Sequence, residues 1–121
     1  MRDAAQAYKN MSKQVAEPRD LEAKLLLEAA RRLQAAHDAW EYDDPGLDGA
    51  LLYNRKLWTI FLTSVTREDN PLPAMIRQNV ANLGLFVMNQ TIVLMTAPKR
   101  EQLGPLININ REVAAGLMRR A

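Results

Sequence analysis

The chain has 121 residues, 48% of them hydrophobic and 25% charged, which is usual for one globular domain. Its formal net charge of +2 is too small an excess to argue for a nucleic-acid partner. The absence of cysteine excludes disulfides and thiolate metal sites, so we expect a cytoplasmic protein. No membrane span is predicted, because Asn82, Asn89 and Gln90 interrupt the longest apolar stretch, residues 80–97. The start of the chain has no apolar run typical of a secretory signal.

The first part of the chain predicts two helices of different character. Residues 3–16 are good helix formers with few apolar positions, so residues 1–16 are expected to form a loosely packed helix or arm. A second helix is predicted from Pro18, because proline suits a first turn and Asp20 and Glu22 complement the helix dipole there. Its apolar positions recur at helical spacing: Leu26, Ala29, Ala30, Leu33, Ala36, His37 and Trp40. The stop signal Asp43-Asp44-Pro45-Gly46 follows.

Two further amphipathic helices are predicted over residues 47–67 and 104–120. The apolar face of the earlier one comprises Leu47, Ala50, Leu51, Asn54, Trp58, Phe61, Leu62 and Val65. The face of the later one comprises Leu106, Ile109, Asn110, Val113 and Leu117. Residues 98–102 are expected to be a solvated connector. No strand pattern competes, so we predict an all-α fold, a single-domain helical bundle of four to five helices over residues 1–121.

Three asparagines lie in or beside these apolar faces: Asn54, Asn108 and Asn110. Buried amides must find hydrogen-bond partners. They therefore either fix the register of the helices or receive the backbone of a partner, and the sequence leaves both readings open.

The predicted fourth helix, residues 72–97, is unusual because it is nearly uncharged. Arg77 is its only charged side chain before the connector. Asn70 is expected to be its N-cap, with Pro71 and Pro73 in the first turn that follows. Such a helix is either wrapped by its neighbours or presented to a partner.

The apolar residues of this helix divide into two stripes when they are placed at about 100° per residue. The first stripe comprises Leu72, Met75, Ile76, Val80, Leu83, Phe86, Val87, Val93 and Leu94. The second stripe, roughly opposite, comprises Ala81, Leu85, Met88, Ile92 and Met95. Between them runs a polar line of Gln78, Asn82 and Asn89. The second stripe is either core or the candidate partner-binding site, in which case the first serves the core.

No constellation of residues predicts catalysis. His37 is the only histidine and has no serine or cysteine nucleophile in a recognisable arrangement beside it. The acidic residues 43–48 lack the ligand spacing of a calcium loop, and the five glycines are scattered singly, so no phosphate loop is expected. We therefore expect a protein that is not an enzyme and that carries no cofactor or metal.

One group of residues is compatible with RNA. Arg55, Lys56 and Trp58 cluster in the third predicted helix, and RNA-binding surfaces combine basic and aromatic side chains. Trp58 shares a face with Leu51 and Val65, however, which favours a tryptophan in the core.

Three blocks of sequence together resemble a known family. They are Pro18-Arg19-Asp20 with Glu22 and Leu25-Leu26-Leu27; Ala50-Leu51, Asn54-Arg55-Lys56-Leu57-Trp58, Phe61, Asn70-Pro71-Leu72-Pro73 and Ile76-Arg77; and Asn82-Leu83-Gly84, Phe86-Val87, Pro105-Leu106-Ile107-Asn108-Ile109-Asn110-Arg111 and Gly116-Leu117. With Ala7 and Tyr8 at the start, the chain is similar to the flagellar biosynthesis regulator FlaF family of bacteria. Ser64 departs from the pattern, which places an acidic residue there.

The resemblance implies an accessory factor of flagellum biogenesis that supports the synthesis and export of flagellin. The expected mechanism is direct binding of flagellin, as by a secretion chaperone that covers its amphipathic terminal helices. The alternative is a post-transcriptional regulator of flagellin expression. It would act on RNA, or as an adaptor to a translational regulator protein of flagellin.

Overall fold

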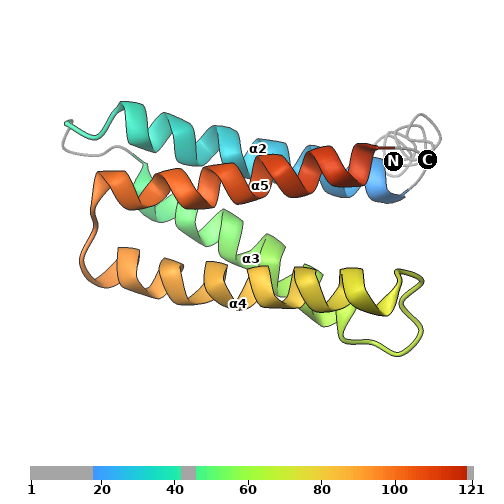
Figure 1. Ribbon diagram of the computed structural model, residues 1–121. Coiled ribbons are helices and arrows are strands. Elements are labelled where there is room, and N and C mark those ends of the chain that lie inside the picture. The colour runs from blue at the N-terminus through green and yellow to red at the C-terminus, as the bar shows by residue number, and fades with distance from the viewer. Residues whose placement is uncertain (1–17, 42–45, 120–121) are drawn as a thin grey trace, which may run out of the picture.

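The computed structural model describes residues 18–41 and 46–119. In this part of the chain lie four α-helices, α2 (Pro18–Asp38), α3 (Leu47–Val65), α4 (Ala74–Thr96) and α5 (Leu103–Met118). A short 3-10 helix, η1 (Arg100–Gln102), precedes α5 (Figure 1). The predicted all-α bundle is confirmed. The predicted segment 3–16 and the turn residues 43–45 lie outside the described residues. None of the described helices is long and apolar enough to cross a membrane.

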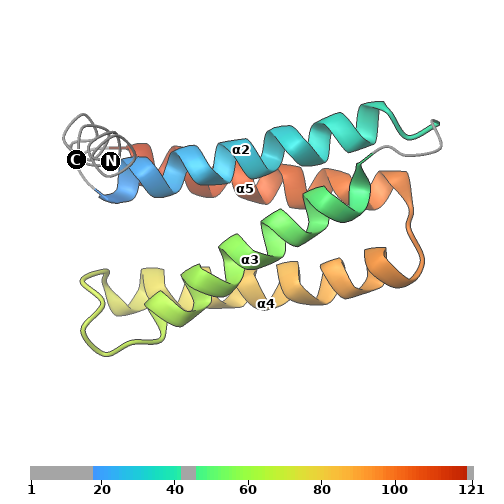
Figure 2. The ribbon, with the colours of Figure 1, turned by 180° about the vertical axis from the view of Figure 1, so that it is seen from behind.

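The helices form two layers joined by a diagonal helix. α2 and α5 lie side by side and run in opposite directions, and α4 lies below them (Figure 1). α3 crosses from the end of α2 down to α4, as the view from behind shows (Figure 2). The extensive contacts are those of α2 with α5, α3 with α4, and α2 with α3. Among the described helices, α3 is therefore the one extensive neighbour of α4.

The core draws buried residues from all four described helices, with α4 adding Val87 and Leu94. α2 contributes small residues, among them Ala23, Ala29 and Ala30, which are fully buried and let its neighbours approach closely. Trp58 is also fully buried and meets Phe61 edge-to-face, with ring centroids 5.6 Å apart. The prediction that this tryptophan belongs to the core is confirmed.

A chain of buried polar side chains ties α3 to α5. The indole N–H of Trp58 donates a hydrogen bond to Asn110 Oδ1 (2.9 Å), and Asn110 Nδ2 donates to Asn54 Oδ1 (2.7 Å). Both asparagines are fully buried, whereas Asn108 is exposed. The two amides are thus partners of each other, which favours the register reading over reception of a foreign backbone.

The start of α4 differs from the prediction. Asn70 is not its N-cap: the helix begins at Ala74, with Pro73 in an extended conformation before it. Because the residue before a proline is disfavoured in the α conformation, Leu72 cannot readily join the helix. Asn70 instead orders the loop, accepting a hydrogen bond from the Leu72 N–H (3.0 Å) and donating to the Ser64 carbonyl (3.0 Å).

The connector before α5 is more ordered than predicted. Pro98, Lys99 and Glu101 are exposed as expected, but Arg100 is partly buried. Its Nε donates a hydrogen bond to the carbonyl of His37, 2.9 Å away, and so joins η1 to the last turn of α2. α5 then begins at Leu103, which is fully buried.

Candidate docking surface on α4

α4 buries only a narrow part of its surface. Its buried residues are Gly84, Val87, Thr91 and Leu94, spaced three and four apart. Gly84 faces α3: a Cβ at this position would lie 2.5 Å from Leu62 Cδ2. The small Gly84 thus allows α3 and α4 to pack closely, and the rest of α4 is left with little cover.

Most of the second stripe is exposed. Leu85 and Ile92 each retain 59% of their accessible surface, and Met95 retains 41%. Ala81 and Met88 are half-buried, because they lie within about one turn of Gly84 and share its side of the helix. The candidate partner-binding residues therefore form a surface that the described residues leave largely open.

The expectation that the first stripe serves the core holds only for part of it. Val87 and Leu94 are fully buried, and Leu72, Val80 and Leu83 are half-buried. Its other four members are exposed large hydrophobics: Met75, Ile76, Phe86 and Val93. The physical reason is the missing neighbour, since one helix cannot cover a stripe this wide and α5 touches α4 only slightly.

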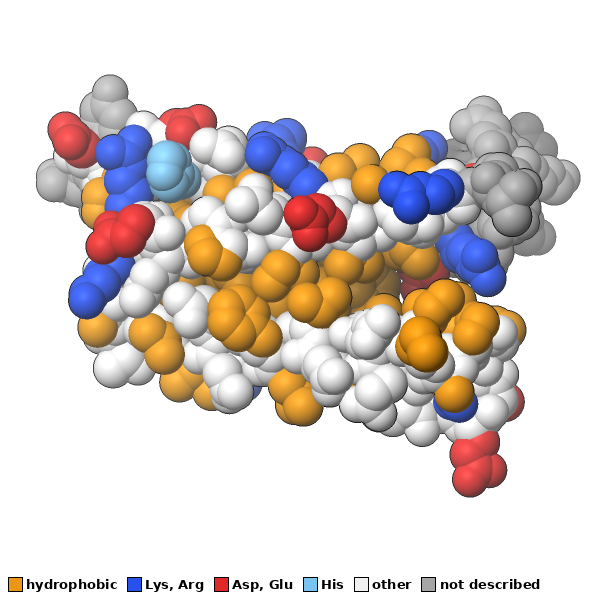
Figure 3. Space-filling view, in the orientation of Figure 1, with side chains coloured by type: hydrophobic (Ala, Val, Ile, Leu, Met, Phe, Trp, Pro, Cys, Tyr) orange, Lys and Arg blue, Asp and Glu red, His pale blue; other side chains and the backbone are white. Residues whose placement is uncertain are grey.

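An apolar groove runs between α4 and α5. In the space-filling view, hydrophobic side chains gather in a band between the upper layer and α4 (Figure 3). Toward the start of α4 the groove contains a pocket of about 390 Å³. Its walls include Phe61 of α3, Val80 of α4, and Val113 and Leu117 of α5. Two half-buried residues of the first stripe, Leu72 and Val80, thus line this cavity.

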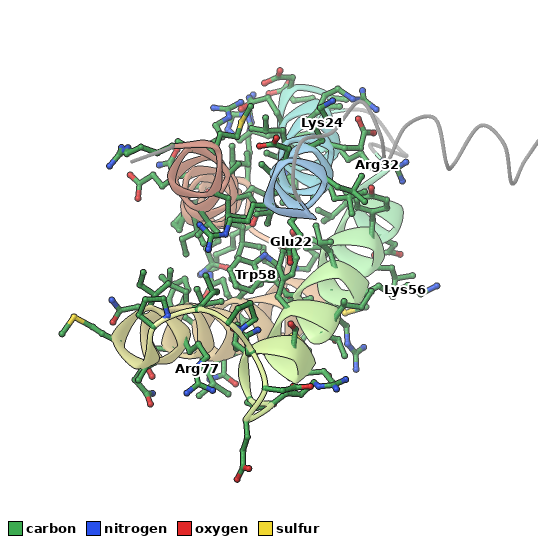
Figure 4. The ribbon with its side chains drawn as sticks, turned by 90° about the vertical axis from the view of Figure 1, so that its right-hand side faces the viewer. Glu22, Lys24, Arg32, Lys56, Trp58 and Arg77 are labelled. Atoms are coloured by element: carbon green, nitrogen blue, oxygen red, sulfur yellow. The ribbon has the colours of Figure 1, made fainter. Side chains whose placement is uncertain are left out.

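Glu22 is the acidic residue among the side chains that line this pocket. It extends from α2 into the space between the two layers, toward which Trp58 also projects (Figure 4). Burial raises the pKa of Glu22 above its ordinary value, while the charge of Arg19, one turn earlier, acts in the opposite direction. Within the described part of the chain, no hydrogen bond or salt bridge is made by the Glu22 carboxylate. From the sequence, Glu22 is predicted only to complement the helix dipole, and its place in the wall of a pocket is not predicted.

The exposed side of α4 is free of charge. Its single charged residue, Arg77, turns toward the loop that follows α3, where Nη1 donates a hydrogen bond to the carbonyl of Arg67, 3.0 Å away. The polar line, Gln78, Asn82 and Asn89, is exposed and separates the open parts of the two stripes. A partner that covers α4 therefore meets apolar side chains on either side of neutral amides.

The other candidate residues do not assemble into a site. His37 Nδ1 lies 3.1 Å from Asp38 Oδ1, and hydrogen bonds from His37 and Gln34 lower the pKa of that carboxyl. Arg55 and Lys56 are exposed, but Trp58 is fully buried and cannot stack on a base. Among the described residues, no three acidic or histidine side chains gather as metal ligands do.

Over residues 18–41 and 46–119 the fold is all-α, and one apolar helix is left largely uncovered along its outer side. A model of the family described as flagellar protein FlaF matches residues 4–117, nearly the whole chain. The chain therefore belongs to the FlaF family of flagellar proteins. No curated protein sequence and no solved structure matches it.

Proposed function

We propose that this flagellar protein is a cytoplasmic chaperone that binds flagellin before export, and that it acts by binding and not by catalysis. The observation that carries the proposal is the uncovered α4, whose exposed hydrophobics lie on both sides of the polar line. A large apolar patch of this kind is typical of a surface that another protein covers. Membership of a flagellar family makes an abundant flagellar protein with amphipathic helices the natural partner.

The shape of α4 suits helical partners. With 23 residues it is about 34 Å long, enough for five to six turns of a helix laid along it. The polar line divides its open surface, so one helix cannot cover both parts. Flagellin's two terminal segments, both of which form amphipathic helices on assembly, would each occupy one side.

Apolar burial supplies the affinity in this proposal. Each large hydrophobic side chain that passes from exposed to buried contributes on the order of 1 kcal/mol or more. Because the exposed side of α4 is itself uncharged, most of the affinity should tolerate salt. An RNA-binding regulator would behave in the opposite way, because phosphate contacts release counterions and weaken steeply as salt rises.

Gel filtration of the protein mixed with purified flagellin at low and high salt tests this function. We expect co-elution at micromolar concentrations under both conditions. Separate elution of the two proteins, together with a complex formed with flagellin leader RNA or with the flagellin translational regulator, would replace the chaperone with one of the regulatory alternatives.

A further inference from the structure

We propose that Glu22 is the polar anchor of the groove between α4 and α5. A lysine or arginine of the flagellin helix in that groove would pair with its carboxylate. This inference rests on the proposed function and specifies which helix the groove selects: one with an apolar stripe and a basic residue that reaches the pocket.

The geometry places Glu22 where an incoming helix would end or pass. The pocket lies at the end of the groove formed by the start of α4 and the end of α5, and its walls come from Val80, Val113 and Leu117. Ile76, exposed one turn before Val80, continues the apolar surface outward. Glu22 projects from α2 into this region, so its carboxylate is within the surface that a docked helix covers (Figure 4).

The pocket is lined by one acidic and one basic side chain, Glu22 and Arg19. The two side chains form no salt bridge in the described structure. Arg77, the single charge of α4, is turned toward the Arg67 carbonyl. The Glu22 carboxylate is thus a half-buried acceptor with no donor of its own among the described residues.

A docked apolar helix would remove more water from this carboxylate. A buried charge without a partner is strongly unfavourable, whereas one that meets a positioned lysine or arginine gains a charge-assisted hydrogen bond. The pocket therefore penalises an apolar helix that carries no basic residue at this place. The Glu22 carboxylate thus favours helices that bring a lysine or arginine to it. This preference is added to the apolar contacts that provide most of the affinity.

The experiment compares the affinity of full-length wild-type protein and Glu22→Gln for purified flagellin by isothermal titration calorimetry. Glutamine has nearly the same shape but lacks the charge, so we expect affinity to fall about tenfold while the melting temperature does not fall. Glu22→Asp should recover part of the loss. Glu101→Gln is the matched control, because Glu101 is exposed in η1 at the opposite end of the molecule, and it should bind as wild type.

A double-mutant cycle identifies the partner of Glu22. The loss in Glu22→Gln should be non-additive with replacement of one lysine or arginine in a terminal segment of flagellin by glutamine. Additivity with every such replacement, or a self-association that Glu22→Gln abolishes, would overturn the assignment. Unchanged affinity of Glu22→Gln overturns it too but leaves the chaperone function standing, whereas failure of the wild type to bind flagellin removes both.

Discussion

Gly84 of α4 lies against the side chain of Leu62 of α3, so closely that an added Cβ would be 2.5 Å from Leu62 Cδ2 and 2.7 Å from Leu62 Cγ. Contacts this short require Leu62 to move. This pair limits how closely α4 can approach α3, its extensive neighbour among the described helices.

Gly84→Ala should therefore destabilise the protein. Alanine gains about 1 kcal/mol in helix propensity, but overpacking of a helix contact costs about 1–3 kcal/mol, so we expect a net loss of about 1 kcal/mol in urea unfolding. Gly116→Ala is the matched control, since nothing lies within 4 Å of its added Cβ, and it should be more stable than wild type. Leu62→Ala in the same chain should relieve the overpacking; if Gly84→Ala alone is as stable as Gly116→Ala, the close approach is not a constraint.

Asn110→Ala should lower the free energy of unfolding by about 2–4 kcal/mol. The variant leaves the indole N–H of Trp58 and Asn54 Oδ1 without partners in the core, and each unsatisfied buried group costs about 1–3 kcal/mol. Asn108→Ala, on the same helix but exposed, should change stability by less than about 0.5 kcal/mol. Urea unfolding monitored by far-ultraviolet circular dichroism measures both, and equal effects of the two variants would contradict the proposed importance of the buried chain.

Leu85→Glu and Ile92→Glu should weaken flagellin binding by about tenfold or more with little loss of stability. Both side chains are mostly exposed, so the free protein tolerates a carboxylate there, but a complex would bury it unpaired. Ile60→Glu is the matched control, because Ile60 is 63% exposed but lies on α3. Calorimetric titration with flagellin and a thermal melt are made on each variant. Unchanged affinity in both α4 variants would mean that the second stripe is not the docking surface.

Glu22→Gln should raise the free energy of unfolding at neutral pH. Burial raises the pKa of the Glu22 carboxyl in the folded state, so the folded protein holds this proton more tightly than the unfolded chain. Stability is then lost as the pH rises from the unfolded pKa through the higher folded pKa. The greater stability of the glutamine variant should be present at about pH 7. It should disappear below about pH 4, where the wild-type Glu22 carboxyl is neutral in both the folded and the unfolded state. Unfolding curves at several pH values show whether the sign is correct.

Glu28→Gln should have the opposite pH dependence. Hydrogen bonds from Arg31 and Arg32 lower the pKa of Glu28 to about 2. The folded state therefore binds the Glu28 proton less tightly than the unfolded chain does. The stability contributed by the contacts of Glu28 with the two arginines is present above the pKa that Glu28 has in the unfolded chain, and it is lost as the pH falls toward 2. The melting temperatures of wild type and variant should differ most near neutral pH and converge in acid. If the difference in melting temperature instead grows as the pH falls, the contacts of Glu28 with Arg31 and Arg32 do not stabilise the folded state.

Local rules predicted much of the fold. Pro18 begins α2 because proline suits a first turn, and the three-and-four spacing of α3 correctly placed Trp58 in the core. Long-range facts were out of reach of such rules. The mutual pairing of Asn54 and Asn110 joins residues 56 positions apart, and periodicity only marks each of them as lying on an apolar face.

The candidate site could be predicted only in part, because local sequence patterns do not reveal long-range contacts. The charge-free character of residues 78–97 and the two stripes follow from the sequence, but their exposure depends on which helices pack against α4. Phe86 and Val93 have the pattern of core residues and remain open because α5 does not cover them. The sequence around Glu22 predicts only an acidic residue in the first turn of a helix. It does not reveal that residues of α3, α4 and α5 line a pocket together with Glu22.

The sparse cover of α4 by the other described helices also has a consequence for the supply of the protein. In the described part of the chain its outer hydrophobic side chains are exposed. A partner that covers them binds the folded state alone, so the melting temperature of the protein should increase with the concentration of that partner. Molecules in excess of their partner would keep this surface available to one another and to unrelated chains. Balanced production of the two components would then be as necessary for keeping this protein folded and dispersed as any contact within its own core.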